Sequence, residues 1–364
     1  MLLRHFLQSA ALAGILGLMC CASQAQPAGA QGENFLYRVV QGDTLGELAQ
    51  RYTSGAFNWA ELQRINSVAD PARLPIARLL RIPFSMIPEV PASAVVRHVA
   101  GQATVDGQAL SQSSTVAEGQ TVATGPNGFV TLQLADDSLL SVPPDASLTL
   151  TRLRTFQGTG LTDSIVRMEN GSVESQVAPR DTGVGRFEVR TPVSVTGVRG
   201  TRLRVHVSSD GSRSEVVSGH AGVDAARDAE VMLREKQGVA VNQAGQSLGV
   251  RQLLPAPKLS APQRGGSGWS VDFPPIPGAS AYLVTVASDP QGSDVVLRSQ
   301  APAPPVQFNA PGPGTYYVFV RAMDDVGIGG LDARQPFEGR PVLQTGGGLP
   351  VSTGYGGFIS VADY

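Results

Sequence analysis

The chain has 364 residues, of which 42% are hydrophobic and 16% are charged, so it is long enough for two or three domains with buried cores. Its 42 glycines and 26 prolines favour many turns and short strands over long helices. A formal net charge of -2 and an aromatic content of 6% exclude a chain that is drawn as a whole to nucleic acid or to an anionic membrane.

Residues 1–25 have the pattern of a cleavable secretory signal peptide. A positively charged start precedes an apolar run from Ala10 to Cys20, and small residues stand before the expected cleavage point after Ala25. Both cysteines, Cys20 and Cys21, lie in this segment, so the exported chain is expected to form no disulfide. No later stretch is apolar over the roughly 18 residues that a membrane span needs. The sequence therefore predicts a protein of the periplasm or cell envelope with no transmembrane span.

The only predicted helices lie within residues 35–84. Thr44 and Glu47 have the spacing of a capping box at the start of a first helix, and Asn58 and Glu61 repeat that spacing before a second helix. Apolar, strand-like residues stand at both ends of the segment. This order predicts a small βααβ module near the lower size limit for independent folding.

Several runs in this segment resemble the LysM family. They are Tyr37 to Leu45, Leu62 to Asn66, Asp70 to Leu74 and Leu80 to Pro83. The resemblance implies binding of glycan that contains N-acetylglucosamine, and hence of peptidoglycan, in a groove between the loop before the first helix and the loop after the second. The sequence departs from the family at Pro75-Ile76-Ala77, where a Pro-Gly or similar turn is usual, so we expect a different backbone path there.

The resemblance also implies which residues contact the glycan. Carried over, these positions are Gly42, Asp43, Thr44, Leu45, Asp70, Pro71, Ala72, Arg73, Leu74, Pro75 and Ile76. A neutral sugar with N-acetyl groups needs backbone donors and acceptors beside a small apolar surface, and it needs no charge. A structural role is the alternative to glycan contact at each position: Thr44 serves as a cap, Leu45 fills a core and Gly42 allows a turn.

Residues 95–250 are predicted to be a series of short strands. Apolar and polar residues alternate over 186–195 and over 202–207, which is the pattern of half-buried strands. The expected turns are Asp106-Gly107, Asn127-Gly128, Asn170-Gly171 and Asp210-Gly211. Proline-marked linkers are expected at 85–94 and 254–262, and a short disordered lead-in at 26–34.

The stretch 95–223 resembles the periplasmic FecR-type domain. The runs that carry the resemblance are Thr124-Gly125, Ala135 to Ser138, Glu169 to Val173, Phe187 to Pro192, Val198 to Thr201 and Val217 to Gly219. Family members with an anti-sigma segment pass an iron-siderophore signal across the inner membrane, which requires a cytosolic segment and a span. A cleavable signal peptide leaves no such path, so the resemblance implies a periplasmic scaffold or sensor that contacts another protein.

Self-cleavage at Gly200-Thr201 is the alternative chemistry that the resemblance suggests. The Thr201 hydroxyl would attack the Gly200 carbonyl, and water would then open the resulting ester. The nearest candidate base, His206, is five positions away, so on a regular strand it faces away from Thr201. A glycine that turns a hairpin, followed by a threonine in a strand, is the interpretation that we favour.

Residues 263–342 resemble a fibronectin type III sandwich, a spacer or protein-binding module. Its anchors are the early Trp269, the turn Pro277-Gly278-Ala279 before Tyr282, and Gly314 to Tyr317 at the start of a late strand. Packing in the core is expected for Trp269. The remaining segment, 343–364, is a Gly-rich tail.

No arrangement of residues in the sequence predicts an enzyme. The four histidines are His5, His98, His206 and His220, and no two have the spacing of metal ligands. Nucleotide-binding and hydrolase motifs are absent, so we expect no cofactor and no metal. The arginines are scattered, so no nucleic-acid partner is expected.

The sequence as a whole predicts a multidomain protein: a LysM-like βααβ module, a FecR-like all-β domain and a fibronectin type III-like sandwich. The predicted function is an envelope protein that binds peptidoglycan glycan chains through the LysM-like domain and presents the FecR-like domain as scaffold or sensor. A second partner would be an unidentified periplasmic or envelope protein. The alternative is a FecR-type signalling or sensor protein without direct sigma-factor contact, with cleavage at Gly200-Thr201 as an option.

Overall fold

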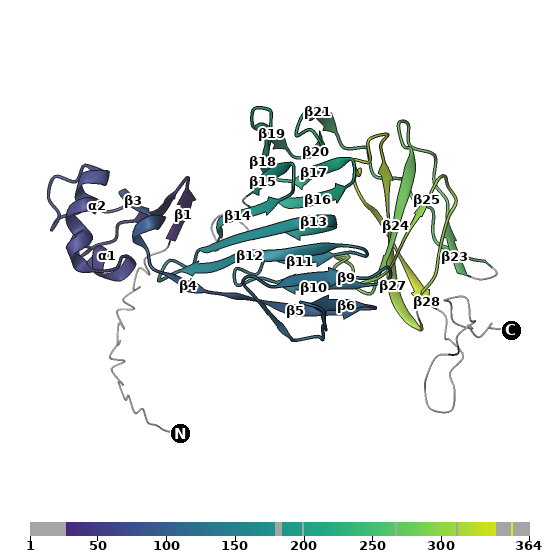
Figure 1. Ribbon diagram of the computed structural model, residues 1–364, viewed down its shortest axis with the longest axis horizontal. Coiled ribbons are helices and arrows are strands. Elements are labelled where there is room, and N and C mark those ends of the chain that lie inside the picture. Colours follow the sequence, from purple (N-terminus) through teal and green to yellow (C-terminus); the bar gives the residue numbers. More distant parts are fainter. Residues whose placement is uncertain are drawn as a thin grey trace, which may run out of the picture.

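The computed structural model describes residues 27–178, 184–198, 200–265, 268–310, 312–339 and 351. The predicted signal peptide, and the predicted tail apart from Val351, lie outside the described residues. The described chain is mostly β-strand, and three bodies follow one another along its long axis: a small helical module, a large β domain and a smaller β domain (Figure 1). None of the helices in this part of the chain is long and apolar enough to cross a membrane.

The N-terminal module packs two short helices on a three-stranded antiparallel sheet. Its elements are β1 (Pro27–Gln31), β2 (Asn34–Arg38), α1 (Leu45–Tyr52), the 3-10 turn η1 (Ala56–Asn58), α2 (Trp59–Asn66) and β3 (Leu79–Pro83), with sheet order β1-β2-β3. The expectation of a disordered lead-in at 26–34 is wrong, because residues 27–31 form a strand paired with β2. Pairing with β2 satisfies backbone hydrogen bonds of this segment, although its sequence has no strand pattern.

A capping box was predicted at the start of each helix, and the structure has it at only one of the two. At α1 the capping box is confirmed: the Glu47 amide donates to the Thr44 hydroxyl at 3.2 Å, and the Thr44 amide donates to the Glu47 carboxylate at 3.2 Å. At α2 it is wrong, because Asn58 is itself helical and makes no capping bond through its side chain. Of the apolar residues on α2, Leu62 is fully buried, whereas Trp59 is 40% exposed.

The central domain is a stack of two twisted sheets. Its strands are β4 (Glu89–Pro91), β5 (Ser93–Ala100), β6 (Ala103–Val105), β7 (Gln108–Ala109), β8 (Thr115–Ala117), β9 (Thr121–Thr124), β10 (Phe129–Gln133), β11 (Leu139–Val142), β12 (Ser147–Phe156), β13 (Thr162–Gln176), β14 (Val184–Arg190), β15 (Ser194–Val198), β16 (Arg202–Ser208), β17 (Gly211–Ser218), β18 (His220–Ala225), β19 (Val231–Arg234), β20 (Gln237–Asn242) and β21 (Ser247–Gln252). We call the sheet β7-β6-β9-β12-β13-β14-β15-β18-β19 the first sheet. The second sheet is β8-β5-β10-β11-β13-β16-β17-β20-β21.

Strand β13 belongs to both sheets. Its first half pairs with β12 and β14, and its second half, from Gly171 onward, pairs with β16. At the crossing point Gly171 has φ +84°, and a Cβ there would lie 2.4 Å from the Cα of Ala146. The prediction of a turn at Asn170-Gly171 is therefore wrong, because the glycine bends one long strand from sheet to sheet. The other three predicted turn pairs are confirmed as turns between successive strands.

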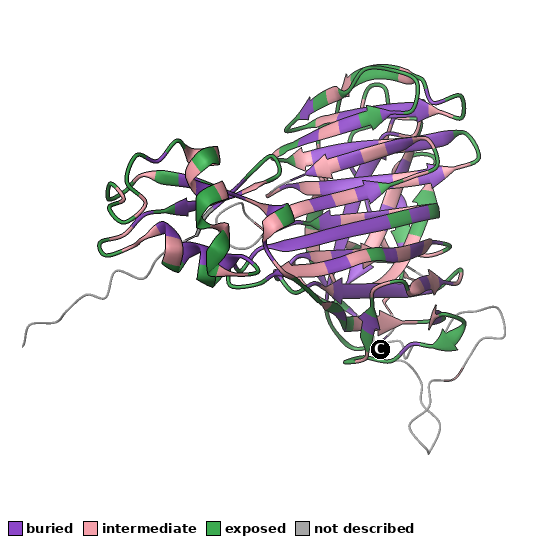
Figure 2. Cartoon of the chain, turned by 60° about the vertical axis from the view of Figure 1, so that its left-hand side comes forward, coloured by how far each residue is buried: buried purple, intermediate pink, exposed green. Residues whose placement is uncertain are grey.

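The core of the central domain fills the space between the two sheets. Its fully buried members come from both sheets and include Leu132, Leu148, Val173, Phe187 and Leu203. Figure 2 shows buried residues concentrated along the strands and exposed residues on the connecting loops. The segment 85–94, expected as a linker, contributes β4, which pairs with β12 in the first sheet.

The C-terminal domain is a smaller pair of sheets. Its strands are β22 (Gln263–Gly265), β23 (Gly268–Val271), β24 (Ala281–Ala287), β25 (Val295–Ala301), β26 (Val306–Phe308), β27 (Gly314–Met323) and β28 (Ala333–Gly339). They form a three-stranded sheet, β22-β23-β26, and a four-stranded sheet, β25-β24-β27-β28. The core between them includes Val284, Val320 and Phe337, and Trp269 packs against it from the edge.

The N-terminal module is fixed to the central domain by aromatic packing. The ring of Phe84, in the 3-10 turn η2 (Phe84–Met86), stacks on Phe156 at the end of β12 with 4.3 Å between ring centroids. Phe156 and Leu161, from the hairpin between β12 and β13, are buried in the core of the module. A shared core of this kind holds the two domains together much more firmly than a linker would.

Candidate functional site

The predicted glycan-contacting residues lie in two neighbouring loops of the N-terminal module. One loop leads from β2 into α1, and the other connects α2 to β3. The Leu45 amide donates to the Pro71 carbonyl at 2.9 Å, and the Ala77 amide donates to the Val39 carbonyl at 2.8 Å. These two hydrogen bonds join residues that are 26 and 38 positions apart in the chain, so the two loops form one continuous surface.

Three of the predicted contact residues are engaged inside the module. Asp43 accepts hydrogen bonds from the Tyr37 hydroxyl and from the Val40 amide, both at 2.8 Å. Burial and the bond to Asp43 raise the pKa of Tyr37 well above its usual value, so this hydroxyl remains a donor. Thr44 caps α1, and Leu45 is fully buried. These side chains shape the first loop from within.

The outward surface of the two loops is formed by other predicted residues. Gly42, Ala72, Arg73, Pro75 and Ile76 are exposed, and the Ile76 side chain is the most notable because it is apolar and 66% exposed.

The rest of the second loop supports that surface. The Asp70 carboxylate accepts a hydrogen bond from the Ala72 amide at 2.9 Å, which holds the turn that begins the loop. Pro71 and Leu74 are half-buried, and Leu74 packs against the core of the module. The two loops therefore expose mostly backbone and apolar carbon to solvent, and the exposed charged residues among the predicted contacts are Asp70 and Arg73.

The turn at Pro75-Ile76-Ala77 is closed despite its unusual sequence. The Arg78 amide donates to the Pro75 carbonyl at 3.2 Å, and Ala77 has φ +66°. A positive φ at the third position is the requirement of a type II turn, which glycine meets without strain and alanine does not. Ala77 thus takes up the conformation that a glycine would take, at a cost in stability.

Gly200 and Thr201 lie directly before β16, between β15 of the first sheet and β16 of the second sheet. The expectation of a hairpin with Thr201 inside a strand is wrong, because β15 pairs with β14 and β18 while β16 pairs with β13 and β17. Gly200 has φ +60°, and Thr201 is 1% exposed. The Thr201 hydroxyl donates to the His220 carbonyl at 2.8 Å and accepts from the His220 amide at 3.3 Å. His206 is engaged elsewhere, since its Nδ1 bonds the Ser172 hydroxyl at 2.8 Å.

A row of polar side chains on the second sheet contacts the C-terminal domain, and the sequence analysis did not identify it. The row consists of cross-strand neighbours, in order His98, Thr131, Ser141, Glu174, Arg204 and Glu215. The alternation over 202–207 predicted Arg204 on a solvent face, yet Arg204 and Glu215 are buried. The signal that could have found the row is the polar residue at one register position of each strand.

The contacts made by this row are hydrogen bonds and ion pairs. Thr131 donates to the Ser293 carbonyl at 2.6 Å, and Arg204 donates to the Gly330 carbonyl at 2.7 Å. Arg204 also pairs with Glu215, with 2.8 Å between Nε and the carboxylate. Side chains that are buried in this way need such partners, because an unpaired buried charge is costly.

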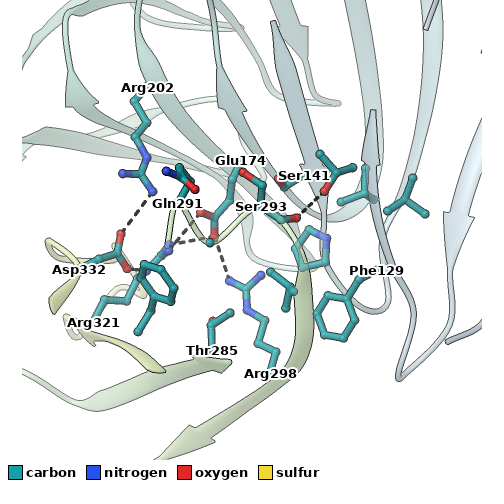
Figure 3. A pocket seen from close by; sticks show the side chains of 17 residues that line it. Phe129, Ser141, Glu174, Arg202, Thr285, Gln291, Ser293, Arg298, Arg321 and Asp332 are labelled. Atoms are coloured by element: carbon teal, nitrogen blue, oxygen red, sulfur yellow. Dashed lines mark hydrogen bonds and ion pairs between the residues drawn. The ribbon is translucent and has the colours of Figure 1, made fainter. Parts of the chain in front are cut away.

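Glu174 pairs with two arginines of the C-terminal domain, Arg321 and Arg298 (Figure 3). Both of its carboxylate oxygens accept hydrogen bonds from Arg321, at 3.0 and 3.1 Å. Burial alone would raise the pKa of Glu174, but Arg321, Arg298 and Arg204 hold it well below its usual range. Arg321 donates in turn to Asp332 at 2.6 Å.

The described residues contain no group of three or more His, Cys, Asp or Glu side chains placed to hold a metal ion.

Comparison with known families and structures matches two parts of the chain. The LysM domain model matches residues 37–83, and the FecR protein model matches residues 120–222. No curated protein matches the chain. Two crystal structures of a protein from Parabacteroides distasonis ATCC 8503, provisionally described as an anti-sigma factor, are similar at 18% and 19% identity with a TM-score of 0.30 each. The match covers 36% of this chain and 59% of the solved chain. The chain therefore contains a LysM domain in its N-terminal module and a FecR domain within its central β domain.

Proposed function

We propose that this is a non-enzymatic protein of the bacterial cell envelope that binds peptidoglycan through its LysM domain. The ligand is glycan that contains N-acetylglucosamine, bound across the two loops that the Leu45–Pro71 hydrogen bond holds together. The FecR domain is then held at a fixed position relative to the glycan, as a scaffold or sensor for a protein partner. Export by the predicted signal peptide at 1–25 would bring the chain to this compartment.

One observation carries the proposal: the exposed Ile76 lies on the surface formed by two backbone-rich loops. An N-acetyl group presents a methyl beside an amide, so it is matched by an apolar side chain next to free backbone donors and acceptors. An isoleucine that is 66% exposed on a small rigid turn supplies such an apolar contact. The hydrogen bonds of Asp43 and Thr44 pre-shape the neighbouring loop, which lowers the entropy cost of binding.

The other two domains support a role in presentation. The C-terminal strand order, β22-β23-β26 against β25-β24-β27-β28, is consistent with the fibronectin type III-like sandwich that the sequence suggested. This domain would brace the FecR domain, because the polar row of the second sheet is buried against it. The FecR domain would use other surfaces for its protein partner.

The alternative function is signalling by a FecR domain that cleaves itself at Gly200-Thr201. The observed hydrogen bonds favour the non-cleaving form, because the buried Thr201 hydroxyl is held by the backbone of His220, while the candidate base His206 bonds Ser172 instead. A nucleophilic hydroxyl requires a base within hydrogen-bond reach.

Calorimetric titration of the full chain with chitin oligomers tests the proposal. We expect binding by the wild type, and at least a tenfold loss of affinity in Ile76→Ser. Phe57→Ser is the matched control, because Phe57 is also apolar, lies in the same module, is 73% exposed and belongs to η1, between the helices and outside the two loops. Equal affinities of the two variants, or no heat with the wild type, would overturn the proposal. Retention on purified sacculi then shows whether the polymer is bound as well.

A further inference from the structure

A narrow cavity lies between the central and C-terminal domains, beside the polar row (Figure 3). Its charged lining comes from both domains: Glu174 and Arg202 from the second sheet, and Arg298, Arg321 and Asp332 from the C-terminal domain. The free space inside is about 30 Å³, which holds two or three water molecules or one small polar group. Hydroxyl-bearing Thr131 and Thr285 and the ring of Phe129 complete the walls.

The lining has more positive than negative charge. Three guanidinium groups stand against two carboxylates, and the two oxygens of Glu174 are already used by Arg321. Arg298 is left with one long hydrogen bond within the described chain, to Glu174 at 3.5 Å, although its side chain is only 17% exposed. Burial lowers the pKa of Arg298 to about 10 in spite of the attraction of Glu174. An anion beside Arg298 would relieve this incomplete pairing.

A second, wider hollow adjoins the cavity. It has a volume of about 460 Å³ and shares Arg202, Gln291, Phe319 and Asp332 with the inner cavity. Arg334 and Pro290 form part of its remaining wall. The shared residues make the inner cavity the floor of the outer hollow, which has room for the body of a small molecule.

From this arrangement we infer that the cleft between the two domains binds a carboxylate, with the carboxylate group beside Arg298 and Arg202 and the rest of the ligand in the outer hollow. A planar guanidinium pairs with a carboxylate in a two-pronged geometry, which suits the narrow inner space. Glu174 and Asp332 would repel the second charge of a phosphate, so a singly charged group is favoured. The carboxylate comes either from a free organic acid or from the C-terminus of a peptide that reaches in through the hollow.

Titration calorimetry on the full chain in carboxylate-free buffer tests this inference. N-acetylglycine represents the free acid, acetyl-trialanine represents the peptide terminus, and the amide of each is the uncharged control. We expect at least one acid to bind in the millimolar range or tighter, with at least tenfold weaker binding of its amide. Binding of the short acid alone assigns a small-molecule source, and tighter binding of the peptide acid assigns a peptide terminus. No binding of either acid, equal binding of acid and amide, or tighter binding of inorganic phosphate would each overturn the inference.

Variants locate the site. Arg298→Met removes the charge and keeps most of the side-chain length, and we expect it to lose acid binding at least tenfold. Arg202→Gln is the second variant. The Arg202 side chain is 42% exposed, and removing its charge leaves no buried charge unpaired. We expect the affinity for the acid to fall threefold to tenfold. Arg167→Gln is the matched control, because Arg167 is a 60% exposed arginine of β13 away from the cavity. Unchanged acid binding in Arg202→Gln, or an equal loss in Arg167→Gln, would place the ligand elsewhere even if Arg298→Met fails to fold.

Discussion

Glu174 of the central domain and Arg321 of the C-terminal domain form a two-pronged ion pair, with both carboxylate oxygens bonded to the same guanidinium at 3.0 and 3.1 Å. Glu174 lies on β13, the strand that belongs to both sheets, and Arg321 lies on β27, in the middle of the four-stranded sheet. The pair therefore connects the strand shared by both central sheets to the core of the neighbouring domain.

We expect Glu174→Ala to lower the free energy of unfolding by about 3–5 kcal/mol, because it removes the carboxylate that pairs with Arg298 and leaves Arg321 paired with Asp332 alone. Urea denaturation followed by tryptophan fluorescence and circular dichroism measures the change. Glu169→Ala is the control: Glu169 lies on the same strand with a 52% exposed side chain, and we expect its loss to change stability by less than about 1 kcal/mol. Similar small effects of both substitutions would show that the pair does not stabilise the interface.

His206 should give the protein a stability that falls in mild acid. Burial lowers the pKa of His206 to about 4 from 6.5, and Arg213 and Arg298 add to the shift. The unfolded chain therefore takes up this proton first, so the contribution of His206 is complete above about pH 6.5 and is lost as the pH falls toward 4. The loss amounts to at most about 3 kcal/mol.

Denaturation midpoints between pH 7.5 and 4 measure the effect. We expect His206→Gln to flatten the profile across this range, and His220→Gln, with its exposed side chain, to keep the wild-type slope. A wild-type slope in His206→Gln would show that the loss of stability in acid does not come from His206.

Ala77→Gly should stabilise the LysM domain. Alanine at φ +66° is strained by about 1–2 kcal/mol, and glycine relieves that strain while it raises the entropy of the unfolded chain by somewhat less. The expected gain is up to about 1 kcal/mol, measured as a higher urea midpoint. Ala69→Gly serves for comparison, because Ala69 is exposed, lies in the same loop region and has no positive φ, so its replacement should destabilise. A loss of stability in both variants would show that the turn is not strained.

Phe156→Ala should loosen the attachment of the LysM domain. Phe156 is 4% exposed and stacks on Phe84, so truncation opens a cavity in the shared core and costs about 3–5 kcal/mol. Hydrogen exchange should then show faster exchange in β3 and in the β12–β13 hairpin, with the C-terminal domain unaffected. Phe57→Ala, at a 73% exposed phenylalanine, should leave exchange unchanged. Exchange that rises evenly across all three domains would contradict this local role.

The purified chain should remain intact at Gly200-Thr201. The Thr201 hydroxyl is buried and is bonded to the backbone of His220, and the candidate base His206 bonds Ser172 instead of Thr201. Mass spectrometry after long incubation should show one species, with the same result for Thr201→Ala. Two fragments that meet at Gly200-Thr201 in the wild type, and their absence in the variant, would establish the alternative.

Local patterns in the sequence were sufficient to predict features whose cause is local. The capping box of Thr44 and Glu47 depends on residues three positions apart, and the turn at Asp106-Gly107 depends on two adjacent residues that tolerate positive φ. The LysM and FecR domains could likewise be recognised from short runs of residues. An Asn-Gly pair can form a turn between two strands or a bend within one strand, and tertiary packing decided between them. Asn170-Gly171 bends β13 between sheets because Ala146 lies against the glycine.

The loops of the candidate glycan site were predicted from resemblance, but only the structure separated supporting residues from exposed ones. Leu45 points into the core while Ile76 points to solvent, and that difference is set by how the loops pack on each other.

The amino-acid sequence by itself determined a three-part, mainly β chain with a small helical module before two β domains, because hydrophobic periodicity and turn residues act over a few neighbouring positions. Only the tertiary structure decided that Glu174, Arg204, Arg298, Arg321 and Asp332 meet at one buried interface. Four of these charges come from strands of two domains and resemble solvent-facing residues of their own strands, and Asp332 lies directly before β28. The register of the second sheet and the docking of the C-terminal domain bring them together, and no pattern within a single strand contains that information.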